Sequence, residues 1–369
     1  MTDWDAIARP SLRGLERYDP GETRDALRAR LGLDHLEPLN WNEDRFGPPP
    51  EVLAAAAAEL DSVALYPERL YAEFRDAVAR ARHVPPETVI PAHGAQSLIG
   101  TIASAFLEPG RAVVVPAPTY GLYAQVSAAA GAQVIRVPGD VSGFDLVGMA
   151  AAADRAEATL VWLADPNNPT GGVIGRDHWR AFLEALPPGC AVVADEAYGD
   201  FADPAVMADR REDVLAGRPV IMIRSFSKTF GLAGLRLGFA IADPAVARLL
   251  DIVQEPFNVN RIALAAGRAG VQLDGFVECR RAEVASARDV LRHGLERIGV
   301  SSLPSQANFV LADLAMDERP VTSELITRGV LIRPGSEFGL PGWVRITVAP
   351  EPVMRRLIEL LAAALGRMP

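Results

Sequence analysis

A single lysine stands among the 37 basic residues of this 369-residue chain, and its amine is the first candidate for chemistry. Lys228 lies in the stretch RSFSKTFGLAG, residues 224–234; the other 36 lysine and arginine positions are arginines. Arginine can replace lysine wherever surface charge is enough, but a guanidinium stays protonated and cannot form a Schiff base. One lysine can also survive by chance, so the residues around it decide the interpretation.

The neighbours of Lys228 suit a phosphorylated aldehyde cofactor. The segment SFSK supplies the hydroxyls of Ser225 and Ser227, and Arg236 follows eight residues after the lysine in GLAGLRLG. The planar fork of an arginine donates two hydrogen bonds together, which matches a phosphate. These residues indicate a phosphate site beside a reactive amine.

A second anion site is predicted in AHGAQSLIG. Gly94 precedes an expected helix, so the backbone amides of Gly94, Ala95 and Gln96 would point from its N-terminus toward a phosphate. Glycine before a helix is common, so this motif supports a phosphate site only in combination with the segment around Lys228.

Further residues fit a pyridine ring. Asp195 ends CAVVADEAYGD, and a carboxylate there can hold a ring nitrogen protonated, which makes the ring an electron sink. Tyr198 and Asn168, in DPNNPTGG, can hydrogen-bond a ring hydroxyl, and Tyr120 of PAPTY can stack on the ring. The alternatives are an ordinary tyrosine at a strand end and, for Asp195, a helix cap or an Mg²⁺-binding acidic pair.

Two arginines are expected inside strands of the C-terminal part. Arg333 lies in VLIRPG and Arg345 in WVRITVA, and a buried charge needs a partner. A substrate carboxylate or an internal salt bridge would each satisfy this need. Other chemistries lack support, because the sequence contains no GxxxxGK[ST] loop, no GxSxG turn and no HxxH or HxxxH pattern, so no metal site is expected.

The elements that position these residues follow an α/β pattern. Four apolar runs, RAVVVPAPTY, TLVWLADPNNPTGG, CAVVADEAYGD and PVIMIRSFSK, indicate buried parallel strands whose carboxyl ends carry the candidate residues. Helices are expected between them, and after about residue 261 a smaller α+β lobe follows. We therefore expect an N-terminal arm (1–45), a large cofactor-binding domain (46–260) and a small domain (261–369). The predicted helices are 96–107, 121–130, 176–186, 244–253 and 352–365.

Composition restricts the class of protein. The chain is 49% hydrophobic and 23% charged with a net charge of −10, which describes a soluble globular protein and argues against nucleic acid as a partner. The N-terminus has no basic start or apolar core of a signal peptide, and no long apolar run predicts a membrane span, so a cytoplasmic location is expected. Cys190 and Cys279 both lie in segments expected to be buried.

These motifs resemble those of the fold-type I pyridoxal-phosphate aminotransferases. They occur in the order PTY, DPNNPTG, a strand-end D-x-x-Y, SxSK and the arginine eight residues after the lysine. The resemblance implies a large domain with a mostly parallel seven-stranded sheet and pyridoxal 5′-phosphate as cofactor. It implies that Lys228 forms the Schiff base, Asp195 pairs with the ring nitrogen, and Asn168 and Tyr198 contact the ring hydroxyl. The stacking residue would be Tyr120, and the phosphate ligands Ser225, Ser227, Arg236 and the turn at Gly94, Ala95 and Gln96.

A narrower resemblance, to the histidinol-phosphate aminotransferases, covers nearly the whole chain, from RYDPGETRDAL and NWNEDRFGPPPEV to LYPE, PFNVN, SQANFVL and VRITVA. It implies a histidine-biosynthesis enzyme that transfers an amino group to 2-oxoglutarate by a ping-pong cycle. Its implied substrate residues are Tyr18 and Arg333 for phosphate, Arg345 for carboxylate and Asn42. In an implied homodimer, Tyr66 would reach the cofactor phosphate of the neighbouring subunit.

The chain departs from that pattern at Gln96 and Ser97, at Asp44 in place of the last Asn of NEN, and at Phe257 in place of a tyrosine. These positions leave other donors open, so the alternatives are an aromatic amino-acid aminotransferase and an O-phosphothreonine decarboxylase. A cofactor-binding regulatory domain is a further alternative, but such proteins usually carry a basic DNA-binding segment that this N-terminus lacks.

Overall fold

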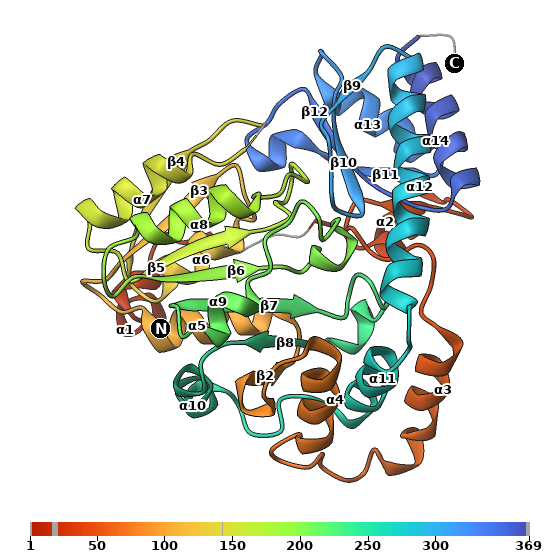
Figure 1. Cartoon of the computed structure of the whole chain (residues 1–369). Coiled ribbons are helices and arrows are strands. Elements are labelled where there is room, and N and C mark those ends of the chain that lie inside the picture. Colours follow the sequence, from red (N-terminus) through yellow and green to blue (C-terminus); the bar gives the residue numbers. More distant parts are fainter. Residues whose placement is uncertain (1, 17–20, 142, 367–369) are drawn as a thin grey trace.

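Two sheets organise the chain, which the computed structural model describes over residues 2–16, 21–141 and 143–366. The larger sheet has seven strands in the order β2-β8-β7-β6-β5-β3-β4, and only β8 runs against the others. The smaller sheet has five strands in the order β1-β11-β12-β10-β9. Figure 1 shows the large sheet below and the small one above. The predicted α/β class with a mostly parallel seven-stranded sheet is confirmed.

The strands of the large sheet are β2 (Val89–Ala92), β3 (Ala112–Ala117), β4 (Gln133–Pro138), β5 (Leu160–Ala164), β6 (Ala191–Asp195), β7 (Val220–Ser225) and β8 (Gly238–Ile241). Those of the small sheet are β1 (Glu37–Leu39), β9 (Ser301–Ser302), β10 (Phe309–Asp313), β11 (Val330–Pro334) and β12 (Trp343–Thr347).

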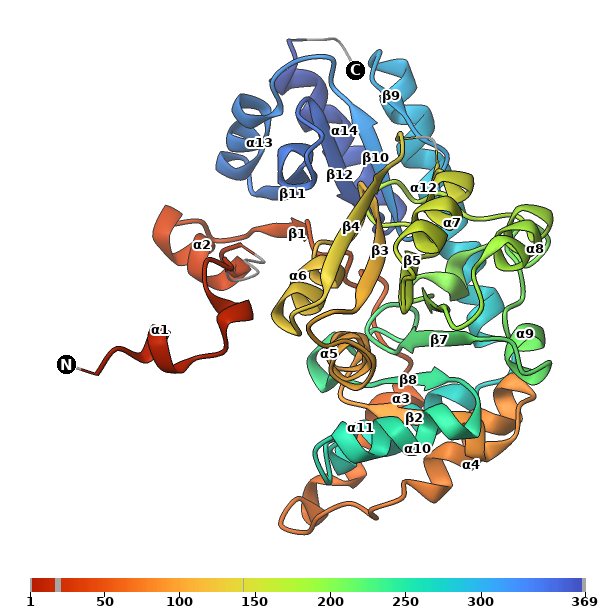
Figure 2. The ribbon, with the colours of Figure 1, turned by 90° about the vertical axis from the view of Figure 1, so that its left-hand side faces the viewer.

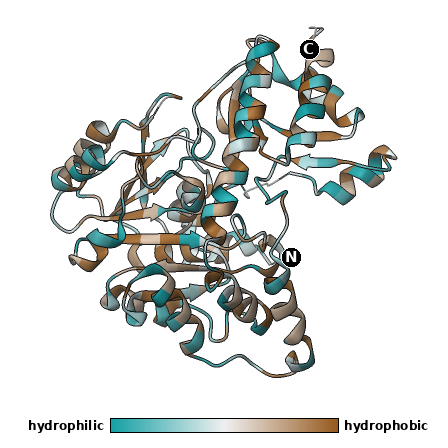
Figure 3. Cartoon of the chain, turned by 45° about the vertical axis from the view of Figure 1, so that its right-hand side comes forward, coloured by the Kyte–Doolittle hydropathy of each residue, from teal (hydrophilic) through white to brown (hydrophobic). Residues whose placement is uncertain are grey.

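The apolar runs are continuous because both faces of the large sheet are covered by helices. Along β3, Val113 and Val115 join the core on one face while Val114 joins the core on the other. Along β5, Trp162 and Leu163 divide between the faces in the same way. In Figure 3 the central strands are largely brown, whereas the outer helices carry both teal and brown segments. A buried strand therefore has no polar alternation to show in its sequence.

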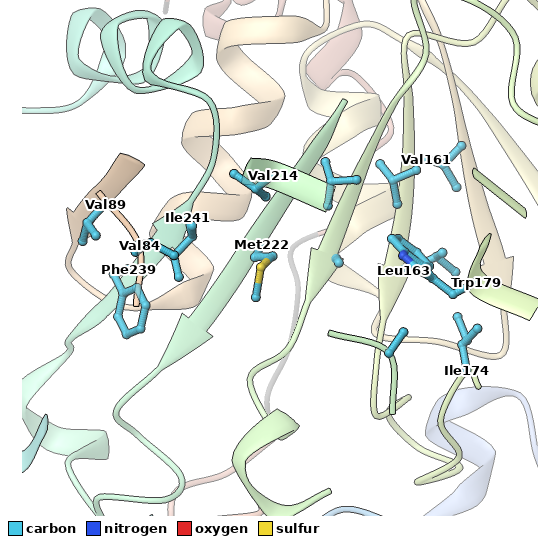
Figure 4. Close-up of a cluster of buried hydrophobic side chains, with 14 of the residues drawn as sticks. Val84, Val89, Val161, Leu163, Ile174, Trp179, Val214, Met222, Phe239 and Ile241 are labelled. Atoms are coloured by element: carbon cyan, nitrogen blue, oxygen red, sulfur yellow. The ribbon is translucent and has the colours of Figure 1, made fainter. Parts of the chain in front are cut away.

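One face is covered by α5 (Ala95–Phe106), α6 (Leu122–Ala129) and α10 (Pro244–Val253). The other is covered by α3 (Pro50–Ala58), α4 (Ala72–Arg82), α7 (Leu146–Arg155), α8 (Arg176–Ala185), α9 (Arg211–Leu215) and α11 (Arg261–Val271), and Figure 4 shows part of this second core. The four predicted helices of this region agree with α5, α6, α8 and α10 to within one residue at each end.

The small sheet packs against α12 (Phe276–Arg297), α13 (Glu318–Thr327) and α14 (Glu351–Ala364), and the predicted C-terminal helix matches α14 to within a residue at each end. Strand β1 pairs in parallel with β11, so a segment from the start of the chain extends the sheet built at its end. The short α1 (Trp4–Ile7) extends away from both sheets in Figure 2, and α2 (Arg24–Leu31) lies nearer the small sheet. The domain boundaries at 45/46 and 260/261 stay a prediction.

One prediction about burial is wrong. Cys190 is buried, but Cys279 is exposed, because it lies on the solvent side of the long helix α12. Within the described part of the chain, no helix combines the length and apolar character needed to cross a bilayer.

Candidate active site

A cavity of about 690 Å³ lies where the carboxyl ends of β5, β6 and β7 meet the small sheet. Parallel α/β sheets place their ligand sites at this edge. Most of the residues predicted for the site line this cavity, including Asn42, Gln96, Tyr120, Asn168, Asp195, Tyr198, Ser225, Ser227, Lys228, Arg236, Arg333 and Arg345.

Lys228 follows β7 by three residues and turns its amine into the cavity. The Nζ atom donates to the backbone oxygens of Trp41 at 3.0 Å and Asn42 at 2.8 Å. Burial, followed by the positive charge of Arg345, lowers the pKa of Lys228 from 10.5 to about 7. A neutral amine, the form that attacks an aldehyde, is therefore abundant near neutral pH.

Asp195, the last residue of β6, is held by two donors. Its Oδ2 accepts a hydrogen bond from the Tyr123 hydroxyl at 2.8 Å, and its Oδ1 accepts one from the amide of Ala197 at 3.0 Å. Burial raises the pKa of Asp195 to about 6, so the group is ionised above that pH. A fixed carboxylate of this kind can pair with a protonated ring nitrogen.

A guanidinium, two hydroxyls and a helix N-terminus form a cradle for a phosphate. Arg236 donates from Nη1 to the Ser227 hydroxyl at 3.3 Å, and the Ser225 hydroxyl accepts from the amide of Ser227 at 3.2 Å. Gly94 precedes α5 with φ = 98°, and a Cβ there would lie 2.7 Å from Nη2 of Arg236. The cradle thus requires glycine at this position, and its donors fit the phosphate of the predicted cofactor.

Gln96 connects the cradle to the predicted stacking residue. Its Nε2 donates to the Tyr120 hydroxyl at 2.6 Å, and its Oε1 lies 3.5 Å from Nη2 of Arg236. Tyr120 also meets Tyr123 edge to face, with ring centroids 5.5 Å apart. The Tyr120 ring is therefore fixed at the wall of the cavity.

Arg345 reaches the cavity from β12 of the small sheet. Its Nη1 donates to the side-chain oxygen of Asn168 at 2.5 Å and its Nη2 to the backbone oxygen of Asn40 at 2.5 Å. The positive charge of this buried guanidinium, together with its planar set of donors, suits an anionic group of a substrate. Arg333 is also buried and forms an ion pair with Glu337, the internal salt bridge that was one of the two expectations for it.

Asn42 is occupied by protein contacts as well as lining the cavity. Its Nδ2 donates to the Tyr198 hydroxyl at 3.1 Å, and its backbone amide donates to Thr347 at 3.1 Å. Its direct role with substrate stays a prediction.

One predicted residue lies elsewhere. Tyr66 is 78% exposed, stacks on Phe257 with centroids 4.8 Å apart, and does not line the cavity of its own chain. Tyr18 lies outside the described residues.

Tyr123 is the main site residue that the sequence did not reveal. It is buried and stacks on Trp162 at 5.3 Å, so its sequence context is that of a core aromatic. Tyr123 is the second residue of α6 and follows Tyr120 by three positions, and this closeness to a predicted site residue was the available signal. Trp41, Glu43 and Phe338 are among the further lining residues that were not predicted.

Comparison with known proteins identifies the family. The family described as aminotransferase class I and II matches residues 34–361. This chain belongs to that family. The histidinol-phosphate aminotransferase of Symbiobacterium thermophilum is 39% identical to this aminotransferase over 97% of this chain and 98% of its own. Histidinol-phosphate aminotransferase 1 of Thiobacillus denitrificans is 36% identical over 99% and 96% of the two chains.

A solved structure agrees with this assignment. The histidinol-phosphate aminotransferase from Sinorhizobium meliloti, in complex with pyridoxal-5′-phosphate, superposes on this aminotransferase with a TM-score of 0.89, at 29% identity and over 97% of each chain. The predicted family, fold type and enzyme class are confirmed.

Proposed function

We propose that this aminotransferase transfers the amino group of histidinol phosphate to 2-oxoglutarate. The observation that carries the proposal is the amine of Lys228, with a pKa of about 7, in one cavity with Asp195 and three arginines. The relatives from S. thermophilum and T. denitrificans are named for this donor and match nearly the whole chain.

Pyridoxal 5′-phosphate is the cofactor, as predicted; the family and the solved relative from S. meliloti support it. When bound, it supplies an aldehyde that condenses with an amine and a ring that draws electrons from the donor's Cα. We assign its phosphate to Arg236, Ser225, Ser227 and the N-terminus of α5, and its ring nitrogen to Asp195.

Lys228 has the main task in the chemical step. Its Nζ accepts the proton released from the donor's Cα and can return it at a neighbouring carbon. The task needs a base whose pKa lies near the working pH, and burial beside Arg345 provides one of about 7. The carboxylate of Asp195, held by Tyr123, keeps a proton on the ring nitrogen while negative charge develops.

The two substrates of the cycle bear different anionic groups, and two arginines are available for them. Arg345 lies beside Asn168, and Arg333 lies beside Glu337 at the same cavity. We assign the carboxylate of the 2-oxo acid to Arg345 and the donor phosphate to Arg333. Planar guanidinium groups suit both anions.

A donor panel tests this choice. Histidinol phosphate, phenylalanine, tyrosine and phosphothreonine are each added to the holoenzyme, and loss of the cofactor's near-visible band is followed in a single half-reaction. Histidinol phosphate should react fastest, and Lys228→Ala should not respond. Faster reaction with phenylalanine, or carbon dioxide release from phosphothreonine, would overturn the assignment in favour of the aromatic or decarboxylase alternative.

We propose that the enzyme works as a homodimer in the cytoplasm. An exposed apolar set between residues 53 and 70 supports a second copy of the chain as its cover, because monomeric proteins rarely expose so many large apolar side chains together. The set comprises Leu53, Leu60, Val63, Leu65, Tyr66 and Leu70. Tyr66 would then reach the partner's cofactor phosphate.

A further inference from the structure

Six charged residues of alternating sign form a chain of ion pairs behind the cavity; four are buried, and Arg224 and Arg82 are partly buried. None of the six lines the cavity itself. We call this set the ion-pair chain; in order of contact it comprises Asp165, Arg210, Glu196, Arg224, Asp200 and Arg82. Three positive and three negative charges balance, which is the condition for burying them together.

Arg210 is the second member and is fully buried. Its Nη2 pairs with Oδ2 of Asp165, and its Nη1 donates to Oε1 of Glu196 at 3.1 Å. The guanidinium carbon lies 4.2 Å from the ring centroid of Trp179 on α8. Figure 4 shows Trp179 and Ile174 among the apolar side chains on this face of the sheet. The two prongs of one guanidinium therefore join two different loops.

Asp165 holds the loop that follows β5. Its amide donates to the backbone oxygen of Asp195 at 2.9 Å, and its Oδ1 accepts from the amide of Ile174 at 3.1 Å. These contacts close the loop 165–174, which carries Asn168. The position of Asn168 relative to β6 thus depends on Asp165.

Glu196 and Arg224 extend the connection from the loop after β6 to strand β7. Glu196 directly follows Asp195, and its amide donates to the backbone oxygen of Ile223 at 2.9 Å. Its Oε2 pairs with Nη2 of Arg224 at 2.5 Å, and Arg224 directly precedes Ser225. Side chains alternate at the strand ends, so Asp195 faces the cavity while Glu196 faces the ion-pair chain.

We propose that Arg210 is a positioning residue for the cofactor: by joining Asp165 to Glu196 it fixes the spacing between Asn168 on one loop and Asp195 and Tyr198 on the other. The inference rests on the proposed cofactor contacts of these three residues. Arg210 touches neither cofactor nor substrate. It acts through the loops that it joins.

The two-pronged contact carries this inference, because nearly every basic residue of the chain is an arginine and the residue type alone says little. A lysine at this position would supply the charge from one nitrogen and could not reach both carboxylates in the same geometry. Charge neutralisation and positioning therefore predict different results for Arg210→Lys.

The experiment compares Arg210→Lys with the double variant Asp165→Asn/Arg210→Met. In the double variant the side-chain oxygen of the new amide at position 165 still accepts from the amide of Ile174, and Glu196 keeps Arg224, so no buried carboxylate loses all its partners. Met149→Ala, a core change in α7 on the same face of the sheet, is the control for lost stability. For each protein, the thermal midpoint and the affinity of the apoenzyme for pyridoxal phosphate are measured. The absorption maximum of the holoenzyme, and the pH at which its absorption changes by half, are measured as well.

Arg210→Lys and the double variant should each bind the cofactor at least about tenfold more weakly than wild type, because removing a group that orients a ligand-contacting residue commonly has an effect of this size. Both should also shift the absorption spectrum. Met149→Ala should lower the thermal midpoint and leave both cofactor readouts unchanged. If Arg210→Lys does not fold, the double variant decides; if neither folds, Asp165→Asn alone should shift the same readouts in the same direction.

A variant that folds without the contact of Arg210 to both carboxylates, and still has wild-type cofactor affinity and absorption spectrum, would overturn the inference. The ion-pair chain would then only balance charge. Failure of the proposed function is distinguishable from this result. Wild-type enzyme that binds pyridoxal phosphate but rejects histidinol phosphate would contradict the donor assignment and leave the comparison of cofactor affinities valid.

Discussion

The amine of Lys228 has its reactivity set by a few neighbours. Its removal from water disfavours the ammonium form, and Arg345 and Arg236 add positive charge around it, so the pKa of Lys228 falls to about 7. The composition of the chain made this residue conspicuous. Its hydrogen bonds to Trp41 and Asn42, which come from a segment almost 190 positions away, were not predictable from spacing.

The lowered pKa of Lys228 predicts a pH dependence of stability. Above about pH 7 the amine is neutral in the folded apoenzyme, whereas in the unfolded chain it stays protonated up to about pH 10.5. The unfolded state then binds more protons, so this residue makes the free energy of unfolding rise with pH between those values. Below pH 7 both states are protonated and its destabilising effect is constant.

Urea unfolding of apoenzyme and of Lys228→Met at several pH values measures this effect. The stability of the variant relative to wild type should be highest at or below pH 7 and decline steadily toward pH 10. A difference that does not change with pH would mean that Lys228 titrates normally in the folded protein.

Arg333 provides a second test at this scale. Arg333→Met should raise KM for histidinol phosphate by roughly tenfold or more, the cost of a lost charge-assisted contact to phosphate, and should change KM for phenylalanine much less. Glu337→Gln is the matched control, because it removes the ion-pair partner and leaves the guanidinium in place. Steady-state kinetics with both donors decide; equal losses for the two donors would contradict the phosphate role.

At the scale of elements, the strand ends and one helix N-terminus bring the site together. The apolar runs predicted strands β3, β5, β6 and β7, and the rule that parallel strands collect ligands at their carboxyl ends predicted where the cavity lies. Tyr123 and Arg210 were not predicted, because a buried aromatic and a charged residue before a short helix have no local pattern that separates them from ordinary positions. Their roles arise from contacts across the sheet.

Gly94 at the start of α5 allows a matched pair of variants. Gly94→Ala places a Cβ 2.7 Å from Nη2 of Arg236 at a φ of 98°, so cofactor affinity should fall strongly. Gly100→Ala lies in the same helix with open space around it and should leave affinity unchanged while raising stability by about 0.5–1 kcal/mol. Apoenzyme titration with pyridoxal phosphate and thermal unfolding supply the two readouts. Normal affinity in Gly94→Ala would remove α5 from the phosphate site.

At the scale of the whole molecule, the cavity draws on both sheets, and a neighbouring subunit is proposed to complete it. Tyr66 cannot be assigned to the cavity of its own chain, since it is exposed and stacks on Phe257. The motif LYPE made this tyrosine a candidate. The contacts of an exposed side chain in an assembly depend on the partner subunit, so they do not follow from the sequence or fold of one chain.

Mixing two impaired variants tests the shared site. Lys228→Ala lacks the reactive amine and Tyr66→Ala lacks the proposed contact to the partner's cofactor phosphate. If Tyr66 serves the neighbouring subunit, each mixed dimer contains one complete site, and activity should return when the two proteins are unfolded, mixed and refolded together. Absence of recovery, with dimers present by sedimentation, would show that Tyr66 does not complete the partner's site.

The central claim is that one amine in this chain, Lys228, bonds to the cofactor in the cavity between the sheets. Borohydride reduction of the coloured holoenzyme, followed by peptide mass mapping, tests it directly, because the chain offers no other lysine. We predict a single pyridoxyl-phosphate label on the peptide containing Lys228, with loss of activity in proportion to labelling. A label on the N-terminal amine alone, or full activity in a protein whose Lys228 is labelled, would contradict the account.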